Sequence, residues 1–170
     1  KHTYMKIIDN FLENNLFLEI QKDLQSESMP WFFKTEDVPG NRLNKNGFFN
    51  HCYYVNSKIN SVLFEKHITP ILNKLNIRKI IEVRANLTFR DKESIQSGYH
   101  IDNENIKSKT AIYCFTKCNS KTDLRLDNEL RQIESVPNRI LVFNTPIYHK
   151  VIYPTDVHKR FVFNFNYETY

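Results

Sequence analysis

Several features are scarce or absent in this 170-residue sequence, and each absence excludes something. Three cysteines cannot all pair within one chain, and there is no signal-like or membrane-spanning apolar stretch, so a reducing cytoplasm is the expected compartment. Cys114 and Cys118 have no second ligand pair at zinc-site spacing after them. No run of basic residues accompanies the net charge of +5, so charge alone does not indicate a nucleic-acid binder.

The sequence also lacks internal repeats, low-complexity segments and linker-like stretches. Apolar residues make up 41% of the chain, including 13 Phe and 9 Tyr, which excludes the aromatic-poor composition of disordered proteins. A chain of this length can bury a sizeable core without disulfides. We therefore expect one domain over residues 1–170.

The periodicity of the apolar residues changes near residue 78. Before it, helical spacing predicts a helix over residues 11–24 and a second over residues 59–75, kinked or restarted at Pro70. After it, alternation of apolar and polar residues predicts strands at 81–89, 98–101, 110–115, 132–136, 139–143 and 161–167. Helices followed by many short strands indicate an α+β, mainly β domain, a sandwich or barrel braced by helices.

His100 and Asp102 lie two residues apart in one predicted strand, so both side chains project from the same face. Imidazole nitrogen and carboxylate oxygen together suit a cation such as Fe(II), and three ligands on one face leave positions open for other molecules. The third ligand is His149 or His158. His149, after a predicted strand end, is the better choice because His158 lies only two residues before Arg160.

Arg160 begins a predicted strand in which it shares a face with Val162 and Asn164, while the aromatic residues face the other way. A guanidinium on the inner face of a sheet needs an acidic partner, because burying it unpaired is costly and its fork matches a carboxylate. The strand pattern therefore predicts that the Arg160 guanidinium has a carboxylate-like partner on the inner face of the sheet.

The series His100-x-Asp102, His149 and Arg160 resembles that of the Fe(II)/2-oxoglutarate-dependent oxygenases. The chain is most similar to the small prolyl-hydroxylase-like group of phages and bacteria. Three further segments carry this resemblance: Asp9-Asn10-Phe11-Leu12, Pro30-Trp31 and Arg84-Ala85-Asn86.

The resemblance implies a double-stranded β-helix, or distorted jelly roll, and an enzyme that hydroxylates a C–H bond with Fe(II), 2-oxoglutarate and O2. It implies that His100, Asp102 and His149 bind iron. It also implies that Arg160 pairs with the distal carboxylate of 2-oxoglutarate. Many members share that carboxylate with a Ser or Thr two residues after the basic residue, where this sequence has Val162.

The second donor is therefore expected elsewhere, at Tyr113 or Asn86, and Arg84 is a candidate for the substrate pocket or for a solvated strand face. Loops at residues 35–49 and 117–128 are expected at the substrate entrance. The expected substrate is a protein or peptide, with prolyl hydroxylation as one form. A nucleobase or small metabolite substrate, and a non-catalytic β-sandwich binding module, are the alternatives; the oligomeric state is not predicted.

Overall fold

The computed structural model describes residues 4–35, 47–127 and 129–170. The chain begins with β1 (Met5–Ile8), α1 (Asn14–Gln25), β2 (Phe32–Lys34), β3 (Phe48–Val55), β4 (Lys58–Ile59), α2 (Phe64–His67) and α3 (Thr69–Leu72). It continues with β5 (Lys79–Phe89), β6 (Ser108–Cys114), β7 (Lys121–Arg125), β8 (Leu130–Glu134), β9 (Arg139–Asn144), β10 (His149–Ile152) and β11 (Lys159–Glu168). The predicted mainly β class is confirmed.

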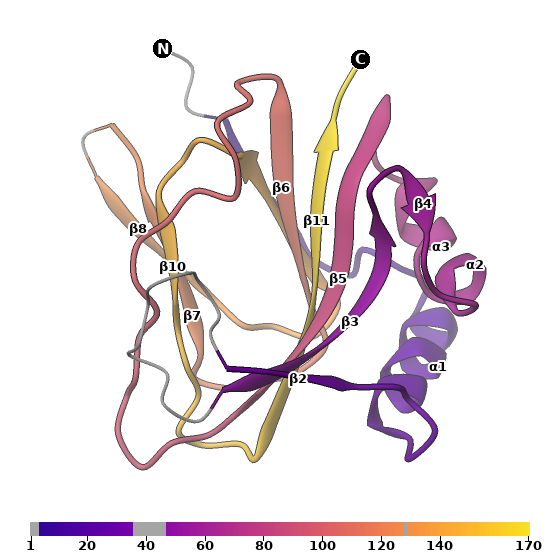
Figure 1. The fold of residues 1–170 in the computed structure, drawn as a ribbon. Coiled ribbons are helices and arrows are strands. Elements are labelled where there is room, and N and C mark those ends of the chain that lie inside the picture. Colours follow the sequence, from indigo (N-terminus) through magenta and orange to yellow (C-terminus); the bar gives the residue numbers. More distant parts are fainter. Residues whose placement is uncertain (1–3, 36–46, 128) are drawn as a thin grey trace.

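The strands form two antiparallel sheets that face each other (Figure 1). In the larger sheet the order is β1-β9-β6-β11-β5-β3-β2, with β4 paired to β3, and in the smaller sheet it is β10-β7-β8. Isolated bridges from Gln96 to Ile152 and from His100 to His149 add the segment before β6 to the edge of the smaller sheet. This arrangement is the expected distorted jelly roll.

The larger sheet has an apolar outer face, which the helices cover. Strand β5 buries Val83, Ala85 and Leu87 on that face, as the period-two pattern predicts. In α1, Phe17 stacks on Phe115 at 5.6 Å between ring centroids. Figure 1 shows α1, α2 and α3 on the same side of the larger sheet. The inner face is thereby left for a second, smaller apolar cluster and for the polar cavity described below.

The second predicted helix is wrong in extent. Residues 59–75 contain two four-residue helices, α2 and α3, which meet at Ile68, and Ile59 belongs to β4. Pro70 lies in the first turn of α3, where its missing N–H leaves no helical hydrogen bond unmade. The expected restart at Pro70 is therefore confirmed, while the continuous helix is not.

Several strands were not expected. Strand β3 pairs with β5, and β1 pairs with β9, so the first half of the chain contributes to the larger sheet. The expected strand at residues 98–101 is reduced to the bridge at His100. In the two expected entrance loops, residues 36–46 and residue 128 lie outside the described residues, and residues 121–125 form β7. Within the described ranges, none of the helices is both long and apolar enough to span a bilayer.

Candidate functional site

His100, Asp102 and His149 converge between the two sheets. Asp102 Oδ1 lies 3.7 Å from His100 Nε2 and 3.5 Å from His149 Nε2. One potential ligand atom from each residue lies within 4.8 Å of the other two. Two ligands about 2.1 Å from one divalent ion can be at most about 4.2 Å apart, so both measured separations are compatible with a shared ion. His158 is exposed and is not part of this cluster.

Backbone carbonyl groups fix the orientation of both imidazoles. His100 Nδ1 lies 3.0 Å from the carbonyl oxygen of Gly98, and His149 Nδ1 lies 3.1 Å from that of Ile147. A carbonyl oxygen only accepts hydrogen bonds, so Nδ1 is the donor in each ring, and in the neutral imidazole Nε2 carries the lone pair. Two nitrogen lone pairs and the carboxylate of Asp102 therefore face one another, an arrangement that a bound cation stabilises.

Thr110 on β6 holds the other oxygen of the Asp102 carboxylate. Its hydroxyl lies 3.1 Å from Asp102 Oδ2, and also 2.9 Å from Asn166 Oδ1 and 3.2 Å from Thr145 Oγ1. The charged carboxylate is the strongest acceptor of the three. With Oδ2 held in this way, Oδ1 is the oxygen that faces the two imidazoles.

The environment of Asp102 favours its ionised form. Burial acts to raise the pKa of this carboxyl, but the hydrogen bond and charge of His149 and the charge of His100, which these rings supply when protonated, together with the hydrogen bond of Thr110, outweigh it and lower the pKa to about 2. Asp102 is therefore a carboxylate at neutral pH, the form needed to bind a metal ion.

The triad opens into a cavity of about 240 Å³ that contains Arg160. Arg160 is 3% exposed, and its Nε has no hydrogen-bond partner among the described residues. None of those residues forms a hydrogen bond or ion pair with the rest of this guanidinium either. An unpaired buried guanidinium costs free energy, which a bound carboxylate or phosphate would recover.

Two further buried polar atoms in the cavity wall lack hydrogen-bond partners among the described residues. They are Thr88 Oγ1 and Asn86 Oδ1, both on the inner face of β5. In the pairing of β5 with β11, Thr88 lies opposite Arg160, and Asn86 lies opposite Val162. The hydroxyl of Thr88 is thus the polar group placed beside the guanidinium in register.

The remaining candidates from the sequence are divided between the two faces of the larger sheet. Arg84 and Asn86 line the cavity. Tyr113 packs in the core on the outer face, and its hydroxyl donates to Asn138 Oδ1 at 2.6 Å. The structure therefore does not bring Tyr113 to the site, because alternation along β6 sends Ile112 into the cavity and Tyr113 away from it.

Sequence reasoning did not single out Thr88 or Thr110. Thr88 had a detectable signal, since it follows Arg84 and Asn86 at period two in a predicted strand. Thr110 had none, because its contact with Asp102 depends on how the segment between His100 and β6 folds back.

No protein-family model matches the sequence, and no curated protein matches it either. Solved structures do. A prolyl-4-hydroxylase from Pseudomonas putida superposes with a TM-score of 0.68 at 12% identity, over 99% of this chain and 94% of that one. A 2OG-Fe(II) oxygenase family oxidoreductase from Burkholderia pseudomallei gives a TM-score of 0.69 at 10% identity, over 97% and 84% of the two chains.

A prolyl hydroxylase from Trichoplax adhaerens, in complex with a peptide fragment of the hypoxia inducible factor oxygen degradation domain, is also similar. Its TM-score is 0.65 at 16% identity, covering 96% of this chain and 83% of that one. At such identities the likeness concerns the fold alone. This chain thus has the fold of the prolyl hydroxylases and 2OG-Fe(II) oxygenases, with its three-residue cluster and buried arginine in one cavity between the sheets.

Proposed function

We propose that this protein is an Fe(II)- and 2-oxoglutarate-dependent dioxygenase that hydroxylates a C–H bond in a protein or peptide. One observation carries the proposal: a cluster of two imidazole lone pairs and one carboxylate shares a cavity with a buried guanidinium that has no partner among the described residues. The first group needs a cation and the second needs an anion. A metal ion with an acidic cosubstrate supplies both.

His100, Asp102 and His149 would hold the iron. Two imidazoles and one carboxylate on one side of an ion are the ligand set of non-haem Fe(II) oxygenases, and this set leaves positions open on the other side. When bound, Fe(II) supplies the activation of O2, which is coupled to the oxidation of 2-oxoglutarate to succinate and CO2. The role of the chain's own residues is to hold the ligand atoms in position, through Gly98, Ile147 and Thr110.

Arg160 would bind the distal carboxylate of 2-oxoglutarate, with Thr88 as the neighbouring hydroxyl donor. Both residues are buried and have unpaired polar atoms facing the same cavity, so the carboxylate would satisfy the two together. The charges support a dicarboxylate. A divalent ion, Asp102 and Arg160 leave two positive charges in the cavity, and a dianion neutralises them.

A protein or peptide substrate is supported by the likeness to the Pseudomonas putida and Trichoplax adhaerens hydroxylases, the latter in complex with a peptide fragment. Proline-containing peptides are therefore the first substrates to try.

The test is turnover of 2-oxoglutarate to succinate with Fe(II) and O2, without and then with a pool of peptides. We expect a slow basal reaction that His100→Ala and Asp102→Ala abolish, and a mass increase of about 16 Da in a substrate peptide, as hydroxylation requires. His158→Ala, a change at an exposed histidine outside the cluster, is the matched control and should leave the rate unchanged. Absence of succinate with the wild-type protein would exclude the proposal.

A further inference from the structure

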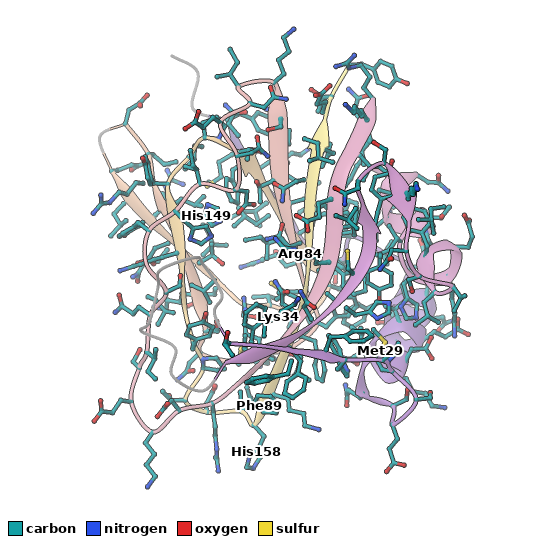
Figure 2. All side chains as sticks on the ribbon, in the orientation of Figure 1. Met29, Lys34, Arg84, Phe89, His149 and His158 are labelled. Carbon is teal, nitrogen blue, oxygen red and sulfur yellow. The ribbon has the colours of Figure 1, made fainter. Side chains whose placement is uncertain are left out.

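Arg84 stands in the wall of the same cavity but far from Arg160. On the inner face of β5, Arg84 is four residues from Thr88, the register partner of Arg160, which corresponds to about 13 Å along the strand. Across the sheet, Arg84 lies opposite Asn164 on β11, which in turn lies opposite Ile112 on β6. Figure 2 shows Arg84 and His149 on opposite sides of the space between the sheets. A five-carbon cosubstrate held by Arg160 and the metal therefore leaves Arg84 for another molecule.

The described contacts of Arg84 leave most of its guanidinium available. Its Nε lies 3.3 Å from Glu82 Oε1, with the two side chains 33% and 30% exposed. An ion pair with about a third of each side chain exposed contributes little to stability. Within the described ranges the two terminal nitrogens make no hydrogen bond, so Glu82 orients the group while its fork faces the cavity. This fork matches a carboxylate or phosphate with two parallel hydrogen bonds.

Asn86 sets a second requirement for the molecule that binds beside Arg84. Its Oδ1 is buried in the cavity wall without a hydrogen-bond partner among the described residues, two positions along the same face of β5. The oxygen atoms of 2-oxoglutarate only accept hydrogen bonds, so the cosubstrate cannot satisfy an acceptor. An N–H or O–H group of a molecule bound in the cavity would supply the matching donor.

We propose that Arg84 binds an anionic group of the substrate, a carboxylate or phosphate, and that Asn86 accepts a hydrogen bond from an N–H or O–H group beside it. This inference rests on the proposed function and narrows its substrate class. A peptide with an acidic or C-terminal carboxylate next to an amide N–H meets both requirements, as does a phosphate ester with a neighbouring donor.

Small probes test the two requirements separately in the protein loaded with Mn(II) and saturating 2-oxoglutarate. N-acetylglycine has the carboxylate and the N–H, N-acetylglycinamide has no charge, and N-acetylsarcosine has no N–H. O-phosphoethanolamine replaces the carboxylate with a phosphate. The measurement is the broadening of probe proton resonances by Mn(II), with Zn(II) as the diamagnetic blank, which reports binding near the metal.

We expect saturable broadening of N-acetylglycine or O-phosphoethanolamine, the stronger of the two identifying the anion, and weaker binding of the two incomplete probes. Arg84→Gln should lower the affinity for the anionic probe about tenfold or more, as expected for loss of a charged hydrogen bond. Arg84→Lys keeps the charge but not the two parallel N–H donors, so its affinity for the anionic probe should lie between those of the wild type and Arg84→Gln. Arg131→Gln, at an exposed arginine paired with Glu129, is the matched control and should bind like the wild type.

The inference is overturned if neither anionic probe binds, if N-acetylglycinamide binds as well as N-acetylglycine, or if Arg84→Gln binds the probes unchanged. In each case, retained binding of Mn(II) and 2-oxoglutarate leaves the proposed function standing. Failure of the wild-type protein to bind Mn(II) and 2-oxoglutarate is the separate outcome that removes the proposed function itself.

Discussion

Arg160 on β11 and Thr88 on β5 lie opposite each other in an antiparallel strand pair, both buried in the wall of one cavity. Neither Arg160 Nε nor Thr88 Oγ1 has a hydrogen-bond partner among the described residues. A buried polar group without a partner costs roughly 1–3 kcal/mol, and more when it is charged. The fold thus contains two adjacent groups that a bound carboxylate would satisfy.

Replacing Arg160 should separate cosubstrate binding from metal binding. In Arg160→Gln the charged hydrogen bonds to the carboxylate are lost, so the Kd for 2-oxoglutarate should rise about ten- to a hundredfold. The Kd for Mn(II) should stay within a factor of about two, because Arg160 is not part of the metal cluster. Calorimetric titration measures both. Arg139→Gln, which breaks an ion pair with Asp9 outside the cavity, is the control; parallel loss of both affinities in Arg160→Gln would show that Arg160 supports the fold.

Thr88→Val should have opposite effects on stability and binding. The isosteric change removes the unsatisfied hydroxyl, so the free energy of unfolding of the ligand-free protein should rise by up to about 1 kcal/mol. The Kd for 2-oxoglutarate should nevertheless rise several-fold, as one hydrogen bond to the carboxylate is lost, while Thr88→Ser should retain the affinity. Urea unfolding and calorimetry provide the two values. If ligand-free Thr88→Val is less stable than the wild type, the Thr88 hydroxyl stabilises the fold.

Thr110 is expected to act through Asp102. Thr110→Val leaves Asp102 Oδ2 without its 3.1 Å hydrogen bond, and loss of such an outer contact lowers metal affinity about ten- to a hundredfold. Thr110→Ser keeps the hydroxyl and should restore most of the affinity. Titration with Mn(II) and the visible spectrum of the Co(II)-loaded protein report this directly. Equal losses in the valine and serine variants would indicate a packing effect instead.

A buried chain of hydrogen bonds outside the cavity predicts a loss of stability in acid. Tyr53 Oη donates to His67 Nδ1 at 2.7 Å, and His67 Nε2 donates to Asp23 Oδ2 at 2.9 Å. Burial lowers the pKa of His67, and the Asp23 carboxylate opposes this only in part. Below the unfolded pKa of about 6.5, the unfolded chain therefore binds a proton more readily than the folded one, so this residue contributes less stability as the pH falls.

The measurement is the free energy of unfolding of the metal-free protein between about pH 7.5 and pH 5.5, where an unperturbed histidine titrates. It should fall with pH, and the slope should be smaller in His67→Gln. If His67→Gln leaves the slope of the free energy of unfolding against pH unchanged, other titrating groups cause that slope.

The sequence is most informative where a strand has one apolar and one polar face. Strands β5 and β11 show this alternation, which by itself places Arg84, Asn86 and Arg160 on polar strand faces. That these faces line one cavity is what the structure adds. His100 and Asp102 are two residues apart, which predicted that their side chains lie on one side, although the expected strand is only a bridge at His100. The candidate metal ligands and Arg160 were therefore accessible to sequence reasoning.

Features that depend on long-range register were not accessible. In β6, Ile112 and Tyr113 are both apolar enough for either face, and only the pairing with β11 sends Tyr113 outward toward Asn138. Strands β7 and β10 have only five and four residues, so their periodicity is weak. The unsatisfied state of Thr88 likewise becomes visible only when its neighbours in space are known.

The central claim is that one cavity binds a metal ion and 2-oxoglutarate together, and calorimetric titration of 2-oxoglutarate with and without Mn(II) tests it most directly. We predict tight binding of 2-oxoglutarate to the Mn(II)-loaded protein, much weaker binding to the metal-free protein, and loss of Mn(II) binding in Asp102→Ala. Binding of 2-oxoglutarate that is indifferent to the metal, or binding of Mn(II) that survives Asp102→Ala, would contradict it.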